Sequence, residues 1–148
     1  MLRIHIFALT AIMAASAVAA RADDPAVINA CLKKAYAGNS NARTCVGLVA
    51  DPCLEQAENQ STHGMVACND RETKIWDGLL NTEYQRLLAA VQGKTKDDIV
   101  KAQRQWMRLR DSDCAIPYAL FEGGTMAQPI GANCIMANTA DRMLQVRA

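Results

Sequence analysis

Apolar residues recur at steps of three and four along most of this chain, which is the spacing of one face of an α-helix. The longest such run extends from Thr62 to Val91, and Gly93 follows it as a stop signal. Residues 95–98 resemble a capping box, so a second amphipathic helix is expected to begin there and to end before Pro117. A short connection between two such helices predicts an antiparallel helical hairpin.

Additional short helices should surround the hairpin. A first helix is expected over 24–38, where Asp24 and Pro25 form a start signal and Gly38 a stop. The pattern also predicts a brief helical piece over 42–50, an irregular loop over 117–133 and a last helix over 133–146. Few segments alternate with a period of two, so the sequence predicts an all-α fold.

The first 22 residues have the pattern of a secretory signal peptide. Arg3 precedes an apolar run over 6–19, and small residues suit cleavage after Ala22, although cleavage after Ala19 also fits. An uncleaved membrane anchor is the alternative, but this run of about 14 residues is shorter than the ~20 that a spanning helix needs. We expect cleavage, no membrane span in the mature protein, and a periplasmic or secreted location.

All six cysteines follow the expected signal peptide, and an even count in an exported chain of this size predicts three disulfides. Sequence alone permits about 15 pairings. Sequential pairing is favoured because each bond would close a loop of roughly 15 to 20 residues and contribute about 3 kcal/mol on the loop-entropy model. The expected pairs, which would staple the helices together, are Cys31 with Cys45, Cys53 with Cys68, and Cys114 with Cys134.

The charge of the chain gives no sign of a polyanionic partner. Sixteen basic and fifteen acidic residues give a net charge of +1. Removing the signal peptide, which holds two basic residues and no acidic one, leaves −1 and a chain of 126 residues, enough for one modest core. Neither nucleic acid nor an anionic membrane is therefore expected as a partner.

The sequence contains no catalytic or metal-binding motif. Zinc sites use closely spaced Cys and His pairs, whereas these cysteines lie 8 to 46 positions apart and His63 is the single histidine after the signal peptide. Nucleophile elbows, HExxH pairs and phosphate-binding glycine loops do not occur in it. Nothing selects a glycosidase pair among the fifteen acidic residues. We expect a non-enzymatic protein with no cofactor and no metal.

Polar residues on the two hairpin helices line up at helical spacing and overlap the apolar side. A network of internal hydrogen bonds is the favoured interpretation, with Arg110 engaging a carboxylate such as Asp77 and fixing the helix register. A ligand-binding role is the alternative. The network residues are Asp77, Asn81, Tyr84, Gln103, Trp106, Arg110 and Asp111.

These residues belong to a longer pattern of fixed order and spacing. The pattern runs Cys68-x-x-x-Glu72, Trp76-Asp77-x-x-Leu80-Asn81-x-x-Tyr84-x-x-Leu87, Gln103-x-x-Trp106-x-x-x-Arg110-Asp111-x-x-Cys114, Gly123-Gly124, Cys134 and Thr139-x-x-Arg142. Over 53–146 the chain thereby resembles the LprI-type lysozyme-inhibitor family. The resemblance implies a helical hairpin with disulfides at its ends, export, and no catalytic residues. It divides the chain into a signal peptide (1–22), an N-terminal helical extension (23–52) and an LprI-like helical domain (53–148).

The resemblance also implies a partner, namely lysozyme or another peptidoglycan-cleaving enzyme. An inhibitor must block a cleft lined by acidic residues, and a rigid loop that presents donors would suit that task. The 117–133 loop, tethered by Cys114 and Cys134, is the candidate, with Tyr118, Phe121 and Thr125 as contacts. The alternative function is an envelope module that binds a small ligand or has a structural role. The extension could cover the surface that a relative uses for binding.

Overall fold

The computed structural model describes residues 23–147, so the expected signal peptide lies outside the described residues. Within this range no residue forms a strand, which confirms the all-α prediction. No helix in 23–147 combines the length and the apolarity needed to cross a bilayer. The elements in chain order are α1 (Asp24–Ala37), η2 (Ala42–Cys45), α2 (Ala50–Leu54), η3 (Ala57–Asn59), α3 (Thr62–Ala90), α4 (Gly93–Leu120) and α5 (Ala127–Arg147), where η marks a 3₁₀ helix.

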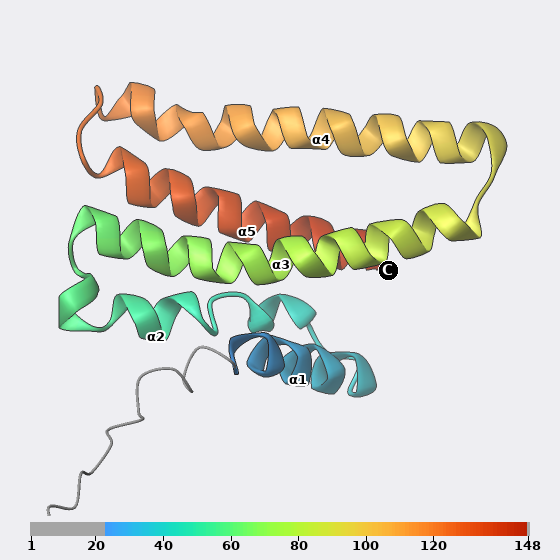
Figure 1. Cartoon of the computed structure of the whole chain (residues 1–148), viewed down its shortest axis with the longest axis horizontal. Coiled ribbons are helices and arrows are strands. Elements are labelled where there is room, and N and C mark those ends of the chain that lie inside the picture. Colours follow the sequence, from blue (N-terminus) through green and yellow to red (C-terminus); the bar gives the residue numbers. More distant parts are fainter. Residues whose placement is uncertain (1–22, 148) are drawn as a thin grey trace, which may run out of the picture.

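The three long helices are arranged around α5. Helices α3 and α4 run in opposite directions and are joined by a short connection, as the hairpin prediction requires (Figure 1). Helix α5 returns between them and packs against both. Helices α1 and α2 lie on the other side of α3 from α4 (Figure 1). The layer order is therefore α4, then α5 with α3, then the N-terminal extension.

The hydrophobic core lies where α1, α3 and α5 meet. Trp76 of α3 has no exposed surface, and Ile28 of α1 and Met143 of α5 are equally buried. Burying a large apolar side chain contributes roughly 1.5 to 3 kcal/mol. The extension thus supplies one wall of the core, although it precedes the residues that carry the family resemblance.

A buried carboxylate fixes the extension to α3. Glu72 is fully buried, and its Oε1 accepts hydrogen bonds from the backbone N–H of Gly47 at 2.7 Å and from Nε1 of Trp76 at 2.8 Å. Its Oε2 accepts from the N–H groups of Val49 at 2.9 Å and Ala50 at 2.7 Å. A buried charge costs free energy unless hydrogen bonds satisfy it, and these four bonds do so.

The brief helix predicted over 42–50 is only partly formed. The η2 turn ends at Cys45, and the chain then turns sharply at Gly47, whose φ is +95°. This left-handed region favours glycine, and a Cβ at Gly47 would also collide with the Asp51 carboxylate. The turn aims the backbone N–H groups of Gly47, Val49 and Ala50 at Glu72.

The loop predicted over 117–133 is wrong in its extent. Helix α4 continues through Pro117 to Leu120, and α5 begins at Ala127 with Pro129 as its third residue. Pro117 removes only one N–H in the last turn of α4, and the carbonyl of Pro117 still accepts from Phe121 at 2.9 Å. Pro129 stands in a first turn, where backbone N–H groups have no partner within the helix. Residues 121–126 alone are irregular.

Three disulfides join sequential cysteines, as predicted. Cys31–Cys45 connects α1 to η2, Cys53–Cys68 connects α2 to α3, and Cys114–Cys134 connects α4 to α5. The Cα atoms of the three pairs are 5.7, 5.6 and 5.4 Å apart. Each bond therefore closes a connection between neighbouring elements.

Candidate functional site

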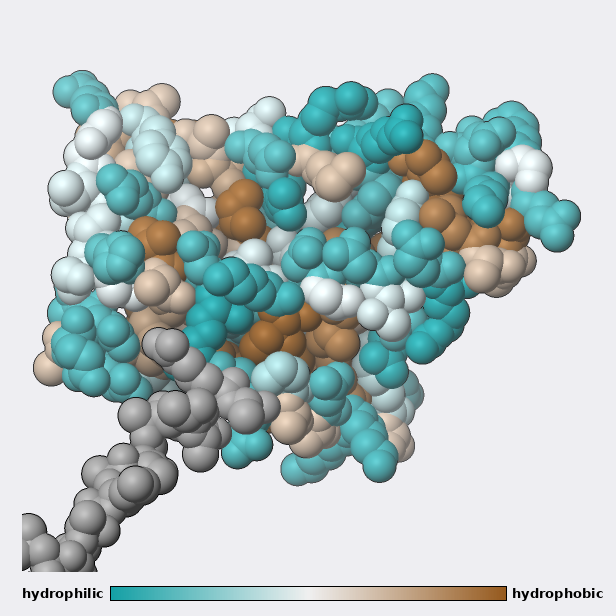
Figure 2. Space-filling model, in the orientation of Figure 1, coloured by the Kyte–Doolittle hydropathy of each residue, from teal (hydrophilic) through white to brown (hydrophobic). Residues whose placement is uncertain are grey.

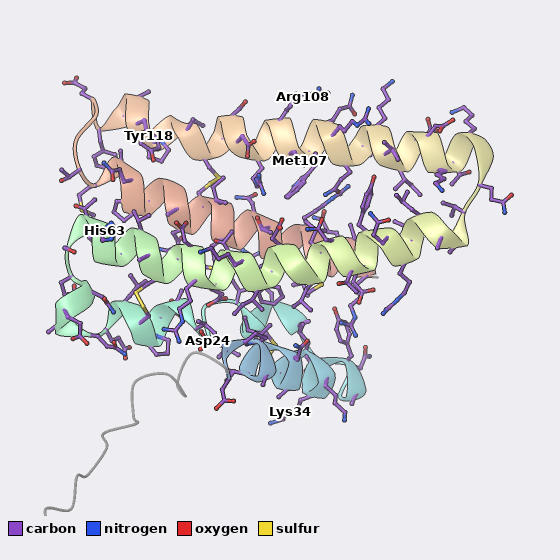
Figure 3. All side chains as sticks on the ribbon, in the orientation of Figure 1. Asp24, Lys34, His63, Met107, Arg108 and Tyr118 are labelled. Carbon is purple, nitrogen blue, oxygen red and sulfur yellow. A yellow bond between two sulfur atoms is a disulfide. The ribbon has the colours of Figure 1, made fainter. Side chains whose placement is uncertain are left out.

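The three predicted contact residues lie at the end of the molecule where α4 turns into α5. Tyr118 is in the last turns of α4, Phe121 caps that helix, and Thr125 lies in the turn that follows. Figure 3 shows Tyr118 at this end of α4, with His63 at the start of α3 on the same side of the molecule. Tyr118 is 48% exposed and Phe121 46% exposed, so both rings are available to a partner.

Exposed apolar side chains gather at this end. Of the eleven large hydrophobic residues that are exposed in the described chain, six fall between positions 116 and 130. Exposed apolar side chains that gather in one region are typical of a protein interaction site. We define the apolar tip as these six residues, namely Ile116, Tyr118, Leu120, Phe121, Met126 and Ile130.

Hydrogen bonds within the turn hold the tip in one conformation. The N–H of Gly123 donates to the carbonyl of Tyr118 at 3.1 Å, and that of Glu122 donates to Ala119 at 3.4 Å. Glu122 has φ +48°, so this arrangement is a Schellman motif with a left-handed residue just past the helix end. The Cys114–Cys134 disulfide lies one to two turns behind it. A rigid tip pays less entropy on binding than a mobile loop would.

A groove of about 490 Å³ opens beside the tip, between α3, α4 and α5. Val66 and Asp70 of α3 line one wall, Asp111 and Tyr118 of α4 the other, and Ile135 of α5 belongs to its apolar surface. Figure 2 shows brown hydrophobic atoms among teal ones in the band beneath α4.

The floor of this groove depends on a glycine. A Cβ at Gly131 of α5 would lie 3.1 Å from both the Cys114 carbonyl oxygen and Cε2 of Tyr118. The absence of a side chain there lets the Tyr118 ring stand directly against the α5 backbone. Tyr118 therefore belongs both to the apolar tip and to the groove.

The predicted polar network is brought together in part. Arg110 donates from Nε and Nη2 to Oδ1 of Asp111 at 3.0 and 2.8 Å, and from Nη1 to the hydroxyl of Thr139 at 3.2 Å. The Asp77 carboxylate instead accepts a hydrogen bond from Nδ2 of Asn81 at 3.1 Å. These two residues lie one turn apart on an exposed face of α3. The Arg110 guanidinium therefore bonds to Asp111, its neighbour in sequence, and to Thr139 of α5. The predicted pair of Arg110 with Asp77 is wrong.

Two guanidinium groups contact the ring of Trp106. The Cζ atom of Arg110 is 5.0 Å from the ring centroid and that of Arg142 is 5.6 Å away. Nε of Arg142 also donates to Oε1 of the buried Gln103 at 2.9 Å. Burial lowers the pKa of the Arg142 guanidinium, and nearby Tyr84 acts in the opposite direction.

Sequence reasoning did not select Thr139, Arg142 or Asp70 as site residues. Thr139 and Arg142 stand in the family-like pattern, so their fixed spacing was the available signal. Asp70 had no such signal, because its position beside α4 and α5 follows from tertiary packing alone. Within residues 23–147 no three Cys, His, Asp or Glu side chains are placed to hold a metal ion together.

Comparison with known proteins agrees with this architecture. The family described as "Lysozyme inhibitor LprI" matches residues 53–146, which span α3, α4 and α5 with two of the three disulfides. The chain belongs to the LprI family. The LprI match begins at Cys53, so the core wall supplied by α1 lies outside it.

One curated relative is an uncharacterized protein of Rhizobium meliloti (strain 1021). It is 26% identical over 93 residues, which cover 54% of this chain and 67% of the relative. No solved structure matches the chain.

Proposed function

We propose that this chain is an exported, non-enzymatic protein-binding domain that inhibits a lysozyme or another peptidoglycan-cleaving enzyme, with the apolar tip as its contact surface. Membership of the LprI lysozyme-inhibitor family is the observation that carries the proposal. Three disulfides support export to an oxidising compartment, because such bonds persist in the periplasm and outside the cell.

The tip has the composition and shape that inhibition requires. Tyr and Phe supply large contact area at low conformational cost, and such residues dominate the binding energy of interfaces when they cluster. The tip lies at the end of the molecule where α4 ends and where α5 and α3 begin (Figure 1). The periplasm or the cell exterior is where such an enzyme meets its substrate.

The test measures residual lysozyme activity on cell-wall substrate while the oxidised protein, without residues 1–22, is titrated in. Combined Tyr118→Ala, Phe121→Ala and Thr125→Ala substitutions should weaken inhibition at least about tenfold, because they remove two aromatic side chains of the tip and an exposed hydroxyl of the turn beside it. Circular dichroism must show an unchanged helix content, so that unfolding is not mistaken for lost binding.

A matched control removes the same kind of surface elsewhere. Three exposed apolar residues lie in the extension, away from the tip. Val27 is 45% exposed, Tyr36 42% and Leu48 37%. Their combined replacement by Ala should leave inhibition within about twofold of the wild type. Full inhibition by the tip variant would mean that the tip is not the surface that contacts the enzyme. Failure of the wild type to inhibit at excess would favour the envelope-module alternative.

A further inference from the structure

Two acidic side chains, Asp70 and Asp111, line the groove beside the apolar tip. The exposed side chain of Asp70 makes no hydrogen bond or ion pair with any described residue. The residues that line the groove within 23–147 include no lysine and no arginine. Arg71, the neighbour of Asp70 in sequence, lines an adjacent pocket together with Asp70 and Lys74 and pairs with Asp24 of α1 through Nη2 at 2.7 Å.

The second carboxylate is only partly neutralised. Both hydrogen bonds from Arg110 reach the same oxygen of Asp111, Oδ1, and leave Oδ2 without a partner among the described residues. The Asp111 side chain is 61% exposed, whereas that of Arg110 is 18% exposed. A ligand that enters the groove therefore meets the carboxylate before it meets the guanidinium.

Apolar and aromatic surface accompanies the two charges. Val66 and Ile135 offer an apolar surface, and Tyr118 offers the face or edge of an exposed ring. An arginine side chain matches this combination, since its stem packs on apolar groups while its planar head pairs with carboxylates and stacks on aromatic rings. The volume of about 490 Å³ is in the range that ligand pockets occupy.

We propose that this groove receives an arginine side chain of the partner protein, with its guanidinium between Asp70 and Asp111 and against the Tyr118 ring. The inference rests on the proposed function for the identity of the partner as a protein, because Tyr118 belongs to both surfaces. The tip then supplies apolar contact and the groove supplies charge recognition, which fixes the orientation of the bound partner.

The first experiment measures the affinity for the inhibited enzyme at about 50 mM and about 0.5 M salt. The double variant Asp70→Asn with Asp111→Asn keeps the shape of both side chains. It should bind at least about tenfold more weakly at low salt and lose most of the salt dependence. The matched control is Asp97→Asn with Asp113→Asn, two exposed acids of α4 outside the groove, which should stay within about threefold.

The single variant Asp70→Asn serves as a check against misfolding. The Asp70 side chain makes no hydrogen bond with another described residue, and its replacement leaves the Arg110–Asp111 pair intact. This single variant should lose at least about threefold in affinity. Unchanged affinity in both groove variants would overturn the inference while leaving the proposed function in place.

The second experiment does not depend on inhibition. A blocked Gly-Arg-Gly peptide is titrated into the isotope-labelled protein, and NMR follows the amide resonances of Val66, Tyr118 and Ile135 and the methyl resonances of Val66 and Ile135. They should shift with the arginine peptide and not with the neutral citrulline peptide, and the double variant should show no shift. Equal shifts with citrulline would contradict charge recognition. Shifts with arginine in a protein that inhibits no lysozyme would retain the groove and reject the proposed function.

Discussion

The two sides of this molecule are built on different principles. Helix α3 buries seven of its 29 residues, and it does so against α1 on one side and α5 on the other. Helix α4 is almost as long, at 28 residues, yet only Gln103 and Cys114 of it are buried. We call α1, α2 and α3 with the facing side of α5 the scaffold side, and α4 with residues 121–126 the presenting side.

This difference separates folding from recognition. The scaffold side holds the buried tryptophan, the buried carboxylate and two of the three disulfides. The presenting side rests on α5 and is closed by one disulfide, while most of the apolar tip belongs to it. Substitutions of buried residues on the scaffold side should therefore have the largest effects on stability, and substitutions of exposed residues at the tip and its groove should change binding.

The largest expected effect compares the two tryptophans. Trp76→Ala should lower the free energy of unfolding by about 3 to 5 kcal/mol, because the ring is fully buried and leaves a cavity. Trp106→Ala should cost only about 1 to 2 kcal/mol, since Trp106 is half-buried at the edge of the core, where it packs against the core and contacts two arginines. Urea unfolding followed by circular dichroism measures both. Equal losses would mean that α4 is as deeply anchored as α3.

The sequence alone does not distinguish these tryptophans. Helical periodicity shows which face of a helix turns inward, and it correctly placed α3. The separate argument from loop length correctly gave the three sequential disulfides. Periodicity does not show how many neighbours cover the inward face. Trp76 is enclosed because α1 and α5 converge on it, and that convergence is a property of the tertiary fold.

The sequence predicted the position of the candidate contact residues along the chain, but not the groove beside them. Cysteine spacing pointed to the segment between Cys114 and Cys134, and Tyr118 and Phe121 do lie exposed on it. Proline was expected to break α4, but its effect on a helix depends on position, and near an end only one hydrogen bond is lost. Asp70, which lines the other wall of the groove, comes from α3 and precedes Tyr118 by 48 positions. Periodicity cannot place residues so far apart in sequence next to each other.

A smaller effect is expected from the buried polar groups of the two sides. Glu72→Gln should destabilise the protein by roughly 2 to 4 kcal/mol, because an amide nitrogen would face N–H donors that now bond a carboxylate. Gln103→Ala should cost about 1 kcal/mol, since one bond from Arg142 is lost and Arg142 keeps its contact with Trp106. Thermal and urea unfolding of the two variants in parallel would reveal the difference. A tolerated Glu72→Gln would show that the extension stays in place without the carboxylate of Glu72.

The smallest expected effect concerns Asp51, which places a second carboxylate next to Glu72. Partial burial raises the pKa of Asp51 above its ordinary value of 3.8, and the neighbouring Glu72 and Glu55 raise it further. The folded state therefore holds this proton to a higher pH than the unfolded state does, so stability falls as the pH rises through the window above 3.8.

Asp51→Asn removes that unfavourable charge. The variant should be slightly more stable than the wild type at pH 7, by no more than about 0.5 kcal/mol because the residue is exposed overall. The gain should disappear below about pH 3, where the carboxyl of the wild type is protonated in both states. Urea unfolding across this pH range supplies its own control at the acidic end. A variant that is less stable than the wild type at pH 7 would mean that the Asp51 carboxylate supports the Gly47 turn more than it repels Glu72, and that the scaffold side depends on this second charge for its shape.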